Sequence, residues 1–199
     1  MKNLAKLAML ALAFLCFAFI NVPTKKTIVI DAGHGGDDHG VTHDELSEKQ
    51  LVQNIATKIK SLDFTNDIEI ILLRDGDSFM SLNERVEKVN EINPDLLISL
   101  HVNYSQNRSE NGVNVYVSES NSNYTDSRQK AEGLLNEISG QYLAKKEVKN
   151  TNLFMLKNVK CPALLLELGY MTNDCDRMYI SGEKGQNEVA GKIMDFLKK

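Results

Sequence analysis

The sequence lacks several features that would place it in common classes of protein. It contains no tract of clustered lysines and arginines, and its formal net charge is −4. Because nucleic-acid binding depends on such clusters to contact phosphates, we expect no nucleic-acid partner. None of the three cysteines has a CxxC or zinc-finger spacing, which argues against a cysteine-ligated metal. Linkers, repeats and low-complexity tracts are absent after residue 24, so we expect residues 25–199 to form one domain.

The N-terminal segment, residues 1–24, differs from the rest of the chain. Lys2 and Lys6 precede an apolar run, residues 7–20, which is shorter than the ~20 residues that a membrane-spanning helix needs. Basic residues followed by a short apolar run are typical of a secretory signal peptide. We therefore expect export to the periplasm or cell envelope. An uncleaved membrane anchor and a lipid on Cys16 remain the alternatives.

Two cysteines, Cys161 and Cys175, would remain after cleavage of such a signal. An oxidising compartment would permit a disulfide between them. A predicted strand separates the two positions, however, so we favour two unpaired thiols.

Strand and helix patterns alternate along residues 25–199. Buried strands are predicted at residues 27–30, 68–73, 96–100, 113–117 and 163–168. Helices are predicted at residues 47–62, 81–92, 127–139 and 183–196. Ser47 with Gln50, and Ser81 with Glu84, have the spacing of capping boxes. The alternation indicates an α/β fold with a largely parallel sheet and helices on both of its faces.

Polar residues follow three of the predicted strands, where a buried sheet would not otherwise favour them. His34 lies in a glycine-rich loop after residues 27–30, His101 follows residues 96–100, and Glu167 interrupts the apolar run at 163–168. Parallel strands would bring these three side chains to one edge of the sheet. Glu48 begins the helix after the His34 loop, close in sequence to the same edge.

Two imidazoles and a carboxylate form an established ligand set for catalytic zinc, and a further carboxylate can act as general base. Other divalent ions also accept these ligands. Each residue has a purely structural alternative: a paired core acid for Glu167, a hydrogen-bonded core histidine for His101, and a helix N-terminal acid for Glu48. His39 and His43 lie in an acidic loop without an HExxH pattern, so we expect them to be solvated or to lie at the rim of any site.

Five motifs together resemble the zinc-dependent N-acetylmuramoyl-L-alanine amidases (the amidase-3 family, AmiA/AmiC/CwlV type). They are IVIDAGHGG at 28–36, SEKQL at 47–51, LLRDGDSFMSLNERV at 72–86, LLISLHVN at 96–103 and PALLLELGYMTN at 162–173. They follow the order of the family's motifs and cover nearly all of residues 27–197. One departure is Ala32, where the family usually has proline.

The resemblance implies zinc on His34, Glu48 and His101, with Glu167 as the catalytic acid/base. It also implies a single α/β domain with about six strands. The expected reaction is hydrolysis of the amide between the lactyl group of N-acetylmuramic acid and the L-alanine of the stem peptide. We expect a monomer without an occluding helix after residues 113–117, and without a wall-binding module.

Two other functions remain open at this point. A zinc peptidase or deacetylase could act on another amide of the cell wall, and a non-catalytic wall-binding protein could retain a similar scaffold. The residues do not indicate whether an activator protein is needed or which muropeptide length is preferred. Asp31 and Asn103 are candidates for supporting the metal ligands or orienting the substrate.

Overall fold

A six-stranded sheet forms the centre of the fold, and the computed structural model describes residues 25–63, 67–74 and 76–199. Its spatial order is β4 (Ile68–Leu72), β1 (Lys26–Ala32), β5 (Leu96–Asn103), β8 (Ala163–Tyr170), β6 (Val113–Val117) and β7 (Lys145–Asn150). The first four of these strands are mutually parallel, whereas β6 pairs antiparallel with β8. The largely parallel α/β sheet predicted from the sequence is therefore confirmed.

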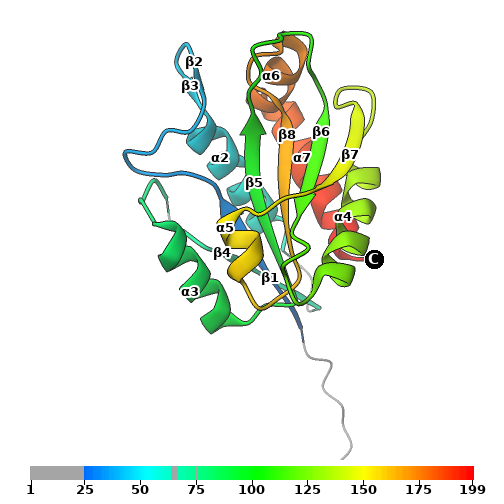
Figure 1. The fold of residues 1–199 in the computed structure, drawn as a ribbon. Coiled ribbons are helices and arrows are strands. Elements are labelled where there is room, and N and C mark those ends of the chain that lie inside the picture. The colour runs from blue at the N-terminus through cyan, green and yellow to red at the C-terminus, as the bar shows by residue number, and fades with distance from the viewer. Residues whose placement is uncertain (1–24, 64–66, 75) are drawn as a thin grey trace, which may run out of the picture.

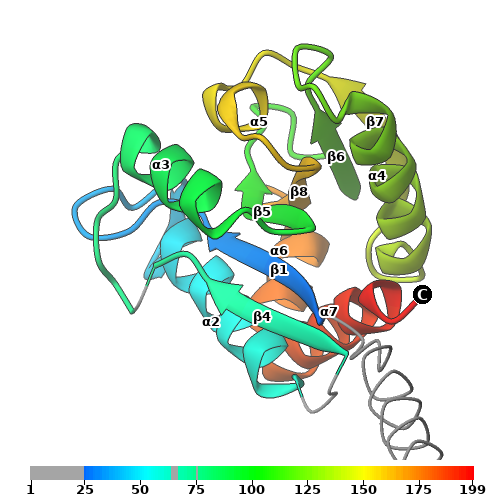
Figure 2. The ribbon, with the colours of Figure 1, turned by 90° about the horizontal axis from the view of Figure 1, so that it is seen from below.

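The two faces of the sheet are covered unequally, as Figures 1 and 2 show. One face packs against α2 (Glu48–Ser61), α4 (Tyr124–Ile138), α6 (Asp174–Ser181) and α7 (Glu183–Leu197). The other face packs against α3 (Leu82–Ile92) and the five-residue α5 (Phe154–Asn158). We call these the closed face and the open face. A short hairpin of β2 (Thr42–His43) and β3 (Leu46–Ser47) precedes α2.

The helix starts show where local sequence signals hold and where they fail. At α3, the Ser81 side chain accepts from the Glu84 backbone amide while the Glu84 carboxylate bonds back to Ser81, so the predicted capping box is confirmed. At α2 the predicted box of Ser47 and Gln50 is wrong, because the Ser47 side chain makes no capping bond. Ser47 instead ends the β2–β3 hairpin, and the tertiary contacts of Glu48 fix the helix start.

Five described elements were absent from the sequence-based prediction, and two of them, β2 and β3, are only two residues long. Strand β7 reads KKEVKN and is largely exposed at the sheet edge, so it has no apolar pattern. Helices α5 and α6 are five and eight residues long, too short for a clear helical period.

The predicted signal segment, residues 1–24, lies outside the described residues. Within the described part of the chain, no helix is long and apolar enough to cross a membrane. Cys161 is buried, Cys175 is exposed, and both are free thiols.

Candidate metal centre

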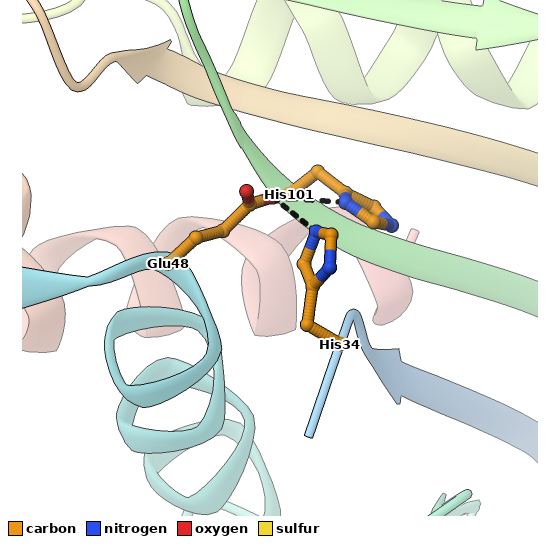
Figure 3. A group of neighbouring side chains, drawn as sticks. All are labelled: His34, Glu48 and His101. Atoms are coloured by element: carbon orange, nitrogen blue, oxygen red, sulfur yellow. Dashed lines mark hydrogen bonds and ion pairs between the residues drawn. The ribbon is translucent and has the colours of Figure 1, made fainter. Parts of the chain in front are cut away.

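Three side chains from separate elements converge at the carboxyl ends of β1 and β5. His34 comes from the loop after β1, Glu48 is the first residue of α2, and His101 lies near the end of β5. Each offers one ligand atom, and these atoms all lie within 4.8 Å of one another. Figure 3 shows both imidazole rings directed toward the Glu48 carboxylate. Such a separation suits three ligands of one metal ion.

Glu48 is the centre of this group and is almost fully buried, at 3% exposure. Its Oε1 lies 2.9 Å from His101 Nδ1 and 3.1 Å from His34 Nε2. The backbone amides of Val102 and Val41 donate to Oε1 and Oε2 at 3.0 and 2.9 Å. Burial alone would raise the pKa of Glu48, but the hydrogen bonds and charges of the two rings outweigh burial and hold that pKa far below its usual range. The carboxylate is thus held in its ionised, ligand-competent form.

His34 is fixed in an unusual backbone conformation, with φ 61°. Few non-glycine residues occupy this left-handed region, and those that do are held there by their surroundings. Burial lowers the pKa of His34, but the Glu48 and Asp38 carboxylates outweigh it and raise the pKa to about 9. The ring lies edge-on to that of His101, with centroids 5.0 Å apart.

Two glycines are needed because the ligand side chains approach the backbone closely. A Cβ at Gly33 would lie 2.4 Å from the His101 ring. A Cβ at Gly40, where φ is +64°, would lie 2.6 Å from Glu48 Oε2 and 2.7 Å from the His34 ring. Any other residue at these positions would displace a ligand.

Glu167 lies beside the group without belonging to it. It pairs in register with His101 on the neighbouring strand β8, so both side chains project from the open face. Its Oε2 is shielded from solvent and has no hydrogen-bond partner among the described residues. Burial raises the pKa of Glu167 to about 7. A carboxyl group that titrates near neutrality can both accept and return a proton.

An apolar groove on the open face leads to the metal site. It has a volume of about 640 Å³ and reaches His34 and His101 at one end. We call it the α3–α5 groove, and its apolar lining consists of Phe79, Met80, Leu82, Leu153, Phe154, Met155, Leu156 and Leu165. Four of these side chains are substantially exposed, namely Phe79, Leu82, Leu153 and Phe154. The groove can therefore receive a bulky ligand beside the ligand cluster.

The family model described as N-acetylmuramoyl-L-alanine amidase (Amidase_3) matches residues 28–199. The chain belongs to this amidase family. All four residues of the site lie within the matched region.

The chain is also similar to curated proteins and to a solved structure, two of them named as amidases. YqiI of Bacillus subtilis is 30% identical, and the alignment covers 85% of this chain and 82% of that protein. The amidase LytC of the same organism is 29% identical, with 85% of this chain but only 34% of LytC covered. The catalytic domain of CwlV from Bacillus (Paenibacillus) polymyxa is 29% identical with a TM-score of 0.80, over 87% of this chain and 96% of that domain.

In this amidase the structure places the sequence-predicted residues as follows. His34, Glu48 and His101 form the cluster, Glu167 lies beside it, and His39 and His43 remain outside it. Asp31 is buried, with Ser99 Oγ donating to it at 2.7 Å and Arg85 paired with it. Asn103 Oδ1 accepts from the backbone amide of Tyr104 at 2.8 Å.

Two buried arginines support the His34 loop and were missed at the level of sequence. Arg85 Nη2 donates to the His34 carbonyl at 2.5 Å, and Arg74 Nε donates to the Ala32 carbonyl at 2.8 Å. Both side chains are almost inaccessible to solvent. One signal could have identified Arg85, since it lies four residues before the buried Val89, on the apolar side of α3.

Proposed function

We propose that this amidase binds one Zn²⁺ through His34, Glu48 and His101, and hydrolyses the amide between the lactyl group of N-acetylmuramic acid and L-alanine. The observation that carries the proposal is the buried Glu48 between two imidazoles, with Glu167 beside them, whose Oε2 has no hydrogen-bond partner in the described part of the chain. Family membership supports the proposed substrate, and the arrangement of the four residues supports the role proposed for each of them.

The donor set fits zinc by both number and chemistry. Two imidazole nitrogens and one carboxylate oxygen leave a fourth tetrahedral position open, which is the pattern of catalytic rather than structural zinc sites. When bound, Zn²⁺ would supply Lewis acidity, polarising the scissile carbonyl and lowering the pKa of water toward ~7.

Glu167 would carry the proton from the attacking water to the leaving group. Its carboxylate takes one proton as the water oxygen bonds to the carbonyl carbon. The same carboxyl then returns that proton to the nitrogen as the C–N bond breaks. The products are a lactyl carboxylic acid on the glycan and a stem peptide with a free L-alanine amine. A pKa near neutrality suits both halves of this transfer.

The α3–α5 groove would bind the substrate next to the scissile bond. Its walls are largely apolar, and its Arg85 is already paired with Asp31, so the groove favours an uncharged portion of the substrate over a carboxylate. We further propose that the protein acts outside the cytoplasm, in the periplasm or cell envelope, with peptidoglycan as its partner.

Product analysis on purified peptidoglycan tests the proposed bond specificity. Mass spectrometry should detect intact stem peptides that begin with a free L-alanine amine. Release of acetate, or of fragments cut within the peptide, would contradict the amidase assignment.

Two histidine variants in the same assay distinguish a proposed metal ligand from a histidine outside the cluster. His101→Ala should abolish product release because it removes one ligand. His39→Ala changes an exposed histidine outside the cluster and should retain wild-type activity.

A further inference from the structure

We propose that Asp38 is a positioning residue, whose carboxylate fixes His34 in the tautomer that presents Nε2 to the metal. The inference rests on the proposed function only in assuming that the cluster binds zinc. Asp38 is neither one of the three proposed metal ligands nor the proposed proton-transfer residue, Glu167. Asp38 lies four residues after His34, in the same loop.

The two nitrogens of the His34 ring face two different carboxylates. Nδ1 lies 2.9 Å from Asp38 Oδ2, and Nε2 lies 3.1 Å from Glu48 Oε1. A neutral imidazole carries one proton, and an ionised carboxylate can only accept a hydrogen bond. With the proton on Nδ1, donated to Asp38, the lone pair of Nε2 is directed at the position between the three ligands. A carboxylate behind a ligating histidine fixes the ring orientation and makes the nitrogen a stronger ligand.

Asp38 is held in place by the loop that it stabilises. Its Oδ1 accepts from the Gly40 amide at 3.1 Å. Its backbone exchanges two hydrogen bonds with Gly35, at 2.9 and 3.2 Å. Because both carboxylate oxygens are engaged, the carboxylate presents Oδ2 to His34 in a defined orientation.

The backbone of His34 is also fixed by contacts that do not involve the side chain of Asp38. Arg85 donates to the His34 carbonyl, and Arg74 Nη2 donates to the Gly33 carbonyl at 3.3 Å. These arginines contact backbone carbonyls, so they do not determine the rotation or the tautomer of the His34 ring. The ring is contacted by Glu48 at Nε2 and by Asp38 at Nδ1, and the Asp38 carboxylate selects the tautomer.

His101 offers an internal comparison. Its Nδ1 faces Glu48, and among the described residues it forms no ion pair with a second carboxylate. Loss of Asp38 should therefore affect the ring of His34 and leave that of His101 in place.

Zinc affinity, measured by competition with a chromogenic chelator, tests the proposal without reference to activity. Asp38→Ala should weaken zinc binding by about 10- to 100-fold. Asp38→Asn keeps an acceptor oxygen without the charge, and should weaken it less. The matched control is Asp37→Ala, which removes the same charge from an exposed neighbour and should change zinc affinity less than about twofold.

The ¹⁵N chemical shifts of the His34 ring provide a second measurement. The wild-type zinc form should show a protonated Nδ1 and a ligating Nε2, and Asp38→Ala should show a mixture of ring states at His34 only. A zinc affinity of Asp38→Ala equal to that of Asp37→Ala, with wild-type ring shifts, would overturn the positioning role while leaving the amidase assignment intact. Failure of the wild type to bind zinc would overturn both, whereas failure to release stem peptides with normal zinc affinity would overturn only the function.

Discussion

The closed face of the sheet contributes most of the apolar core, whereas the open face carries the groove and two of the site residues. The closed face carries the larger apolar cluster, built from α2, α4, α6 and α7 against the strands. The open face has a smaller cluster, leaves the α3–α5 groove uncovered, and bears His101 and Glu167 on adjacent strands. Incomplete cover on the open face gives a substrate access to the strand ends. The larger apolar cluster on the closed face stabilises the sheet that positions the site residues. Substitutions on the two faces should therefore have separable effects.

The largest expected effect follows from Glu167→Gln on the open face. The amide keeps the size of the carboxyl group but cannot accept and return the proton, so kcat should fall by about 10²- to 10⁴-fold. Turnover of soluble muropeptides at saturating concentration measures this loss. The matched control is Glu69→Gln on β4, an exposed glutamate that should leave kcat unchanged. A Glu167→Gln enzyme with more than a tenth of wild-type kcat would contradict the assigned role.

The converse effect is expected from Ile193→Ala in α7, on the closed face. Ile193 is fully buried, and the deletion of its side chain should lower the free energy of unfolding by about 3 kcal/mol. Urea denaturation of the metal-free protein measures the change. Under conditions where the variant is folded, its zinc affinity and kcat should match the wild type. A stable but inactive variant would contradict the division between the two faces.

The raised pKa of Glu167 predicts a pH dependence of stability in the metal-free protein. The folded form retains its proton up to about pH 7, whereas the unfolded chain releases it near the ordinary value of 4.5. Between these values the folded state binds more protons, so the free energy of unfolding falls as the pH rises, by up to ~3 kcal/mol from this group. Urea denaturation from pH 4.5 to 8 should show a smaller decline in Glu167→Gln. Parallel profiles for the two proteins would refute burial as the source of the shift.

The smallest effect is expected at the rim of the groove. Phe154 is 43% exposed, so its replacement by alanine should cost little stability and raise KM several-fold, with kcat nearly unchanged. Met178→Ala alters a more exposed apolar residue on α6 and serves as the control. Equal KM values for both variants and the wild type would show that the groove does not bind substrate.

Much of the fold could be predicted because its central strands are buried on both sides. Strands β1, β5 and β8 have apolar or β-branched residues on both faces, and each is followed or interrupted by one polar residue of the site. The charged strand β7 carries no such pattern, because it lies at the edge of the described sheet and most of its side chains are exposed.

The sequence could predict only those site residues whose positions follow from where the strands end. His101 and Glu167 follow from parallel pairing alone, because they occupy matching positions on adjacent strands. Arg85 could not be assigned in this way, since its contact with the His34 carbonyl joins residues 51 positions apart and depends on how α3 packs on the sheet. The hydrogen bond from His34 to Asp38 likewise depends on the left-handed backbone of His34 and the turn that follows it.

We propose that His34, Glu48 and His101 hold one metal ion and that Glu167 lies outside the ligand set. Zinc content and affinity of the purified wild type, Glu167→Gln and His101→Ala proteins distinguish ligands from the proton-transfer residue. We predict one tightly bound zinc per chain in the first two and the loss of tight binding in His101→Ala. Tight zinc binding that survives in His101→Ala, or that disappears in Glu167→Gln, would contradict the account.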